Sequence, residues 1–252
     1  MPTMLEGKVA LVTGGGGGIG RETVRVLTEL GARVVVADVN MDAAEQTVEQ
    51  AGGGPELVAV RTDVSDPDSA AAMVAAAVDR FGRLDIAHNN AGVELGGLDL
   101  ADVDPEQYER VVAVNQRGVY LCMRAEIPQM LAQGSGSIIN TASALGTVAL
   151  PGQSAYVASK HGVIGLTKAA AMEYSARGIR INAVLPGVIQ TPMIDEMEAL
   201  TPGFTDMLLR QHPIGRLGTP TDVANAVAWL GSDLSAFVTA SSLVVDGGYS
   251  AH

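Results

Sequence analysis

Short apolar runs alternate with longer helix-patterned segments along the whole chain, and this alternation constrains the fold more than any other feature. The runs are rich in Val, Ile and Ala, which is typical of buried parallel strands, and the segments between them carry apolar residues at helical spacing. The sequence therefore predicts an α/β fold with a doubly wound, seven-stranded parallel sheet and helices on both faces. The predicted strands are Val9 to Thr13, Arg33 to Asp38, Leu57 to Thr62, Leu84 to Asn89, Gly136 to Thr141, Ile179 to Leu185 and Ser242 to Asp246, and the predicted helices cover residues 19–30, 41–51, 67–81, 105–132, 153–177 and 220–231.

No sequence feature divides this pattern into separate units. The 252 residues suit one domain, 1–252, without an interdomain linker or an internal repeat. The one long irregular stretch covers residues 186–218 and contains prolines at positions 186, 192, 202 and 213. Loops of this length in a compact domain are usually functional, so we expect a substrate-binding lid there.

The composition excludes several classes of protein. A net charge of −12 opposes binding to nucleic acid and to anionic membranes, and no apolar stretch approaches the roughly 18 residues of a membrane-spanning helix. The histidines are not paired with Cys, Asp or Glu at metal-ligand spacing, so we expect no metal. The single cysteine, Cys122, lies in an apolar helical stretch and is expected to be a buried, unreactive thiol. A soluble cytoplasmic protein is the prediction, since no export signal is visible.

A glycine-rich loop follows the first predicted strand directly and leads into the first predicted helix. It reads Thr13-Gly14-Gly15-Gly16-Gly17-Gly18-Ile19-Gly20. Glycines permit the tight turn and the close approach of a pyrophosphate, which the free N–H groups of the helix start attract. Because strand, loop and helix occur in this order, the loop predicts a dinucleotide-binding Rossmann fold with strand order 3-2-1-4-5-6-7. Its expected cofactor contacts are Gly14, Gly18, Ile19 and Gly20.

Asp38 ends the second predicted strand and lies 18 residues after Gly20. A carboxylate there can accept hydrogen bonds from the adenosine ribose hydroxyls, whereas the 2′-phosphate of NADP would meet a like charge. Two unit charges 4 Å apart interact by about 4 kcal/mol near a protein surface, which is enough to decide a preference. No Lys or Arg stands at positions 15 to 19, 39 or 40 to receive that phosphate. The sequence therefore predicts NAD as the cofactor.

Tyr156 and Lys160 are four residues apart in a predicted helix, so both lie on one face. An ammonium group close to a phenol favours the phenolate, and so would the positive ring of bound NAD⁺. We therefore expect a Tyr156 pKa well below 10 in the working enzyme, so that Tyr156 exchanges a proton with an alcohol oxygen. By itself, however, a Tyr and Lys pair at this spacing is usually a surface feature.

Together with the glycine-rich loop, the pair resembles the short-chain dehydrogenase/reductase family, in its form of roughly 250 residues. The resemblance runs from Lys8 to Gly248. It is carried by Thr13-Gly14 to Gly20, Asn89-Asn90-Ala91-Gly92, Asn115, Ser143 and the Tyr156/Lys160 pair, which stand in the family's order and spacing.

The resemblance implies roles for further residues. Ser143 would stabilise the substrate oxygen, Lys160 would also bind the nicotinamide ribose, and Asn115 would hold a water in a proton relay to Lys160. Tyr156 and Lys160 would contact the cofactor as well as act in catalysis, and hydride transfer would use the B face of the nicotinamide. The other implied cofactor contacts are Asp63, Val64, Asn90, Ala91, Gly92, Pro186, Gly187, Val188 and Thr191. Without the family pattern, Ser143 could be a helix cap, Asn115 a polar break in a long helix, and Asp63 a turn residue.

Apolar residues at helical spacing in the lid indicate the kind of substrate. Met193, Met197 and Phe204 belong to this stripe, and Leu95 and Leu145 are expected to add apolar surface from the opposite side, together with Ser143. Such a stripe can equally be ordinary packing. If it faces the site, it predicts a neutral, hydrophobic secondary alcohol or its ketone as substrate.

Two other functions compete with this one. Reduction of 3-oxoacyl groups on an acidic carrier protein occurs on the same scaffold, but a net charge of −12 would repel that carrier. A dinucleotide-binding regulator without turnover is the non-enzyme alternative. The family resemblance also implies a homotetramer, assembled through the helices that carry Asn115 and Tyr156, where Gly162, Gly165, Ala169 and Ala170 would permit close helix approach.

Overall fold

The computed structural model describes residues 3–190 and 203–251. Seven parallel strands form one sheet in the order β3-β2-β1-β4-β5-β6-β7, as predicted. The strands are β1 (Val9–Thr13), β2 (Arg33–Asp38), β3 (Leu57–Arg61), β4 (Ile86–Asn89), β5 (Gly136–Thr141), β6 (Ile179–Pro186) and β7 (Ser242–Val245).

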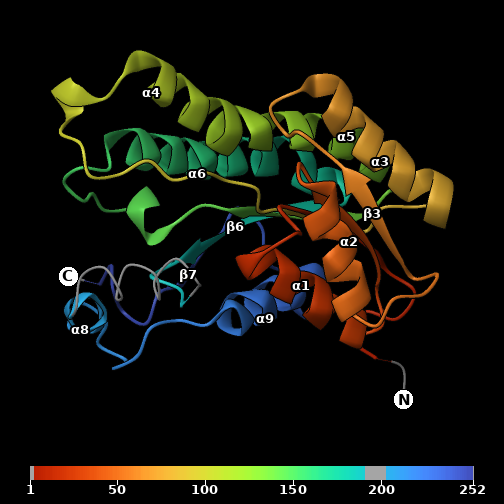
Figure 1. Ribbon diagram of the computed structural model, residues 1–252. Helices are drawn as coiled ribbons and strands as arrows, with labels where there is room; N and C mark the ends of the chain where they lie inside the picture. Colours follow the sequence, from red (N-terminus) through yellow and green to blue (C-terminus); the bar gives the residue numbers. More distant parts are fainter. Residues whose placement is uncertain (1–2, 191–202, 252) are drawn as a thin grey trace.

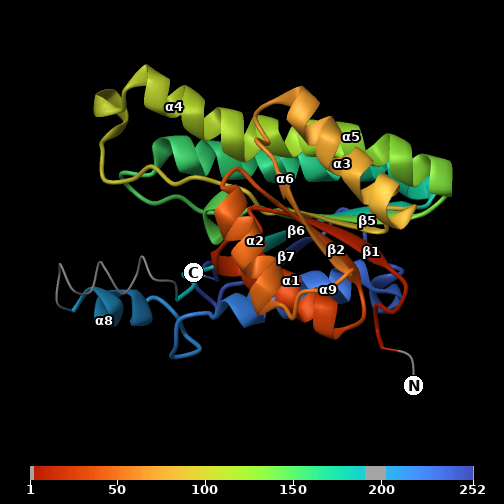
Figure 2. The same cartoon turned by 45° about the vertical axis from the view of Figure 1, so that its right-hand side comes forward.

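Helices cover both faces of this sheet (Figure 1; Figure 2). One layer contains α3 (Pro67–Phe81), α4 (Pro105–Val112), α5 (Gly118–Gln133) and α6 (Ser154–Tyr174), and the other contains α1 (Gly18–Glu29), α2 (Met41–Gln50) and α9 (Pro220–Gly231). The short helix α8 (Phe204–Leu209) projects beyond the sheet on the second side.

The core lies on both faces because strand residues alternate in direction. In β1, Val9 and Leu11 pack with one buried cluster, whereas Ala10 and Val12 pack with the other. All five residues of β1 are buried, which explains its unbroken apolar sequence. Burying each larger side chain contributes about 1.5–3 kcal/mol.

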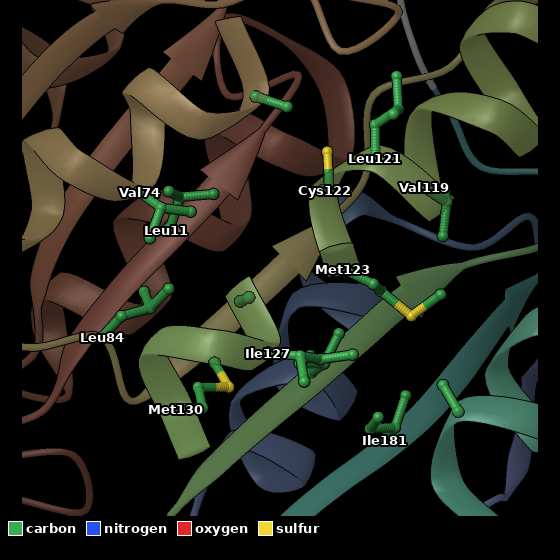
Figure 3. Packing of buried hydrophobic residues seen from close by; sticks show 14 of the residues in the cluster. Leu11, Val74, Leu84, Val119, Leu121, Cys122, Met123, Ile127, Met130 and Ile181 are labelled. Atoms are coloured by element: carbon green, nitrogen blue, oxygen red, sulfur yellow. The ribbon is translucent and has the colours of Figure 1, made fainter. Parts of the chain in front are cut away.

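Cys122 belongs to the first of these clusters, together with other α5 side chains such as Met123 and Ile127 (Figure 3). Its thiol is buried, and burial raises the pKa of this thiol well above its usual value. The expectation that Cys122 is buried is therefore confirmed, and its low reactivity stays a prediction.

The predicted helix ends are set by local capping groups. Thr219 and Asp222 form a capping box at the start of α9, with Pro220 in its first turn. At the end of α3, Gly82 adopts a left-handed conformation (φ 81°), which a side chain would oppose.

Most element boundaries differ from the prediction by no more than three residues, and two differences have a clear structural cause. β4 begins at Ile86 rather than Leu84, because the backbone N–H and C=O of Leu84 pair with the side chain of Gln133 instead of a strand. The single helix predicted for residues 105–132 is wrong in one respect, because a π-helical turn (Ala113–Arg117) separates α4 from α5. Asn115 lies in this widened turn and is fully buried.

The two ends of the predicted lid region lie side by side. Ile189 forms a parallel bridge with Gly218, and the Gln190 N–H donates to the Gly218 carbonyl at 2.7 Å. Between these ends the structure describes α8 and residues 210–217. Thr191, Met193 and Met197 lie outside the described residues, and so does the side chain of Phe204.

Candidate active site

The glycine-rich loop connects β1 to α1, and two of its glycines leave no room for a side chain. A Cβ atom on Gly20 would lie 2.0 Å from the Gly14 carbonyl oxygen, and one on Gly14 would lie 3.0 Å from the Ala91 Cα atom. Gly14 also has a positive φ of 63°. Gly18 and Ile19 are the first residues of α1, so the unpaired backbone N–H groups of the helix N-terminus lie at this turn. This cradle suits a pyrophosphate.

Asp38 ends β2 beside this loop and is held by backbone donors. Its Oδ2 atom accepts a hydrogen bond from Gly16 N–H and its Oδ1 atom one from Asn40 N–H, both at 2.9 Å. Arg21 lies on the other side of Gly16 and donates to its carbonyl, while Thr47 and Gln46 accept from the same guanidinium. The loop therefore lies between one carboxylate and one guanidinium.

The turn after β4 is fastened to the end of β1. The backbone N–H groups of Asn90 and Ala91 donate to the Thr13 hydroxyl at 2.9 and 3.1 Å, and the Asn90 side chain donates to the Thr13 carbonyl. β1 and β4 are neighbours at the point where the strand order reverses, which is where ligands bind in such sheets.

Asp63 forms a turn of its own. Its Oδ1 atom accepts hydrogen bonds from the N–H and the hydroxyl of Ser65, which lower the pKa of the Asp63 carboxyl. The neighbouring Val64 is buried against Gly118. The turn role proposed for Asp63 is therefore observed, and the adenine contact of Asp63 and Val64 stays a prediction.

Helix α6 carries Tyr156 and Lys160 on one face, as their spacing predicts. The Lys160 Nζ atom lies 5.4 Å from the centre of the Tyr156 ring and donates to the Thr141 carbonyl at the end of β5 (2.9 Å). Ser143 follows β5 two residues later and lies close enough to the Tyr156 phenol to lower its pKa. Ser143 also accepts from Leu145 N–H at 3.1 Å and so caps a short 3-10 turn. The cap and the contact with Tyr156 are thus compatible.

Asn115 binds the segment that follows Gly92. Its Oδ1 atom accepts from Val93 N–H (2.7 Å), and its Nδ2 atom donates to the Val93 carbonyl (2.8 Å) and to Ser159. A Cβ atom on Gly92 would lie 3.3 Å from Asn115 Oδ1 and 3.6 Å from Lys160 Nζ. Asn115 and Lys160 therefore border the same glycine, while the side chain of Asn115 is already largely paired.

Burial dominates the titration of the two central groups in this structure. It raises the pKa of Tyr156 to about 12, against the hydrogen bond from Ser143, and the negative charge of Glu94 adds to the rise. Burial also lowers the pKa of Lys160 to about 8, and Glu94 opposes that change. Burial of the phenol thus raises the Tyr156 pKa in the protein alone, and the lowered pKa expected with NAD⁺ bound stays a prediction.

The segment after β6 contacts the C-terminal part of the chain. Gly187 packs on Asp246, and Val188 N–H donates to Nε2 of His212 at 3.3 Å. Nδ1 of the same ring bonds the Leu208 carbonyl of α8 at 2.8 Å, and the ring lies 5.2 Å from that of Tyr249. His212 thus links the segment expected on the nicotinamide side to α8.

Two predicted substrate contacts are partly buried. Leu145 lies in the 3-10 turn after Ser143, and Leu95 lines a cavity of about 120 Å³ against α4. Sequence reasoning missed Glu94, Gln153, Thr141 and His212. The signal for Glu94 was available, since it is a lone acid two residues after Asn89-Asn90-Ala91-Gly92.

Within the described ranges, no group of three His, Cys, Asp or Glu side chains could hold a metal ion. The helices of residues 3–190 and 203–251 include none long and apolar enough to cross a membrane.

Comparison with known proteins identifies relatives that match nearly the whole chain. A family model described as enoyl-(acyl carrier protein) reductase matches residues 14–250. The chain is 45% identical over 251 residues to cyclohexanol dehydrogenase of Acinetobacter sp., with 99% of this chain and 97% of the relative covered. It is 44% identical to 2,5-dichloro-2,5-cyclohexadiene-1,4-diol dehydrogenase of Sphingobium indicum, with 98% of each chain covered. The crystal structure of levodione reductase superposes with a TM-score of 0.91 at 38% identity, covering 98% of this chain and 99% of that one.

Proposed function

The chain belongs to the short-chain dehydrogenase/reductase family and is an oxidoreductase of alcohol and carbonyl carbons, and from this premise we propose that Tyr156 is the acid and base of its reaction. The observation that carries the proposal is the grouping of Tyr156 with Lys160 and Ser143 at the carboxyl end of the sheet. In the oxidative direction, the Tyr156 oxygen takes the proton of the alcohol. The Ser143 hydroxyl donates to the same substrate oxygen and stabilises its developing charge.

Members of this family use a nicotinamide dinucleotide, and the glycine cradle of Gly14 and Gly20 fits its pyrophosphate. When bound, the nicotinamide accepts the hydride from the alcohol carbon or returns it to the ketone. Lys160 would hold the nicotinamide ribose, and its ammonium group would favour the phenolate of Tyr156. Asn115 would keep the Val93 segment in place beside Lys160 and hold a relay water. The segments of Asp63, Val64, Asn90, Ala91 and Gly92 and of Pro186, Gly187, Val188 and Thr191 would complete the cofactor site.

NAD is the proposed form of the cofactor. The Asp38 carboxylate is fixed by the N–H groups of Gly16 and Asn40, so it would meet the ribose hydroxyls in a defined orientation. Arg21, a cation at the same loop, is already bonded to Gly16, Thr47 and Gln46. A 2′-phosphate would therefore face a negative charge.

The proposed substrate is a neutral, hydrophobic secondary alcohol or the matching ketone. Leu95, Leu145, Met193, Met197 and Phe204 are expected to supply apolar surface to the substrate. Two relatives are named for cyclic alcohols. A carrier-bound 3-oxoacyl group is the runner-up, and the net charge of −12 counts against it.

The experiment is a kinetic comparison of Tyr156→Phe with the unchanged enzyme, using cyclohexanol and NAD and following NADH formation. We expect kcat to fall by about 100- to 10,000-fold, because the ring remains and the transferable proton is lost. The affinity for NADH should stay within about twofold. Tyr174→Phe, at the far end of the same helix, is the matched control and should keep full activity.

Several results would contradict the proposal. Substantial turnover by Tyr156→Phe would require another acid. Binding of NADH without turnover of any alcohol or ketone would favour the regulator, and a preference for a 3-oxoacyl thioester with NADPH would favour the carrier-protein reductase.

We also propose a cytoplasmic homotetramer. The lone, buried cysteine suits a reducing compartment. On α6, Gly165 and Ala169 are exposed, whereas Ala170 is buried, so part of the small-residue stripe is free for close helix approach.

A further inference from the structure

The segment from Gly92 to Gly97 is fastened at both ends beside the active site. At its start, the backbone of Val93 makes two hydrogen bonds with Asn115 (2.7 and 2.8 Å). At its end, Gly97 N–H donates to the Gly152 carbonyl at 3.0 Å, just before α6. The segment therefore runs from the Asn115 and Lys160 side of the site to the entrance of the helix that carries Tyr156.

Glu94 lies between these two attachments, and its carboxylate is oriented by a neighbour. Its Oε1 atom accepts a hydrogen bond from Nε2 of Gln153 at 3.2 Å. Gln153 immediately precedes α6, three residues before Tyr156. Gly96 packs directly on the Gln153 amide, since a Cβ atom there would lie 2.2 Å from Nε2. The position of the carboxylate is thus set by the close packing of two loops.

The Gln153 amide also has an unpaired hydrogen-bond acceptor next to Glu94. Its Oε1 atom is buried and has no hydrogen-bond partner among the described residues. A buried acceptor without a partner is unfavourable, so this oxygen would be stabilised by a hydrogen-bond donor. Glu94 therefore presents an exposed, negatively charged carboxylate, and Gln153 beside it has an unpaired acceptor oxygen.

The negative charge of Glu94 shifts the pKa of both central groups of the site, Tyr156 and Lys160. It raises the pKa of Tyr156 and that of Lys160, and it is the carboxylate that acts on each of them. Because Val93, next to Glu94, is bonded to Asn115, and Glu94 itself is bonded to Gln153 three residues before Tyr156, we expect a substrate at Tyr156 to lie within range of the Glu94 charge.

We propose that Glu94, oriented by Gln153, is a specificity-determining residue that selects neutral alcohols carrying a second hydroxyl group and rejects those carrying a carboxylate. The proposal rests on the proposed function of the Tyr156 site. A second hydroxyl can donate to the Glu94 carboxylate, in a charge-assisted hydrogen bond. A substrate carboxylate would meet a like charge, and within a Debye length of about 10 Å this repulsion is only partly screened.

The test compares three alcohols on one ring skeleton: cyclohexanol, cyclohexane-1,4-diol and 4-hydroxycyclohexanecarboxylate, each with saturating NAD. The variant Glu94→Gln keeps the shape of the side chain and removes its charge. We expect kcat/KM for the carboxylate to rise at least about tenfold and that for the diol to fall about three- to tenfold, both through KM. Cyclohexanol should change by less than about twofold.

The pH dependence of cyclohexanol oxidation distinguishes an electrostatic role of Glu94 from a purely structural one, because a structural role would not shift this profile. Because Glu94 raises the pKa of Tyr156, its neutralisation should shift the rise of cyclohexanol oxidation to lower pH. Asp99→Asn is the matched control, since it removes an exposed charge farther along the same connection, and it should change neither the substrate ratios nor the profile.

Unchanged ratios of carboxylate and diol to cyclohexanol in Glu94→Gln, with an unmoved pH profile, would overturn the inference while the activity on cyclohexanol stands. Failure of the unchanged enzyme to oxidise any of the three alcohols would instead overturn the proposed function.

Discussion

At the scale of the residue, Asp38 combines a structural and a recognition task. Its two oxygens each accept a backbone N–H, one from the phosphate loop and one from the start of the next turn. Because both bonds use the carboxylate as acceptor, an amide in its place keeps one acceptor and loses the charge. The charge and the hydrogen bonding can therefore be separated by Asp38→Asn.

We predict that the unchanged enzyme prefers NAD over NADP by at least about tenfold in kcat/KM, equivalent to roughly 1.4 kcal/mol. Asp38→Asn should narrow this ratio mainly by improving the KM for NADP, because a like-charge repulsion is removed. Asp42→Asn, in the first turn of α2, is the control for a nearby charge. Equal efficiencies with both cofactors in the unchanged enzyme would contradict this prediction.

At the scale of the element, a buried chain of polar side chains joins two strands to two helices. Asn89 of β4 donates to Glu126 of α5 (3.1 Å) and to Asn140 of β5 (3.0 Å), and Asn140 donates to Thr167 of α6 (2.9 Å). All four side chains are buried. Burial raises the pKa of Glu126 to about 8, against the hydrogen bond from Asn89, so the core holds this carboxyl in its neutral form near neutral pH.

This network predicts a pH dependence of stability. Between the ordinary glutamate pKa of 4.5 and the raised value of about 8, the folded chain keeps a proton on Glu126 that the unfolded chain has lost. The contribution of Glu126 is therefore fully present below pH 4.5 and is lost as the pH rises through about 8. Relative to Glu126→Gln, the unchanged enzyme should lose roughly 1 kcal/mol of unfolding free energy per pH unit in this window.

Urea unfolding at a series of pH values measures this difference. Glu49→Gln, an exposed glutamate of α2, should give a constant offset from the unchanged enzyme. If the unfolding free energies of Glu126→Gln and the unchanged enzyme also differ by the same amount at every pH, the Glu126 carboxyl ionises in the core without a free-energy cost. That result would contradict the prediction.

At the scale of the whole molecule, two separate surfaces carry exposed apolar side chains. The first lies on α5 and α6, where Tyr120 and Ala169 line a hollow of about 940 Å³ and Met172 of α6 is also exposed. The second lies at the β7 edge of the sheet, where Leu234, Phe237 and Val244 are exposed. Two independent self-complementary surfaces are what a tetramer with dihedral symmetry requires.

We predict that Ala169→Arg on the first surface and Phe237→Asp on the second each convert a tetramer to a dimer, and that the double variant is a monomer. The charged side chain would be buried unpaired in the respective interface, which opposes association. Light scattering after size-exclusion chromatography measures the mass. Val39→Asp, an exposed apolar position away from both surfaces, should leave the assembly unchanged, and a monomeric unchanged enzyme would contradict the proposal.

The sequence alone determined the features that depend on neighbours within a few residues. The strand runs, most helix boundaries, the glycine loop that opens α1 and the shared face of Tyr156 and Lys160 follow from periodicity, capping and spacing. The position of Asp38 beside the loop also follows, because adjacent parallel strands end at the same edge of the sheet. The roles of these residues remain proposals.

Only the tertiary structure decided the features that depend on distant residues. The contact of Glu94 with Gln153, the bond from Lys160 to Thr141, and the π-turn around Asn115 join segments that no local pattern connects. The pKa of Tyr156 is a clear case, since the spacing places Lys160 beside the phenol, whereas the burial that raises the pKa of the phenol follows only from the packing around it. Spacing along a helix fixes which side chains are neighbours, but desolvation is imposed by everything packed around them, and that packing exists only in the folded chain.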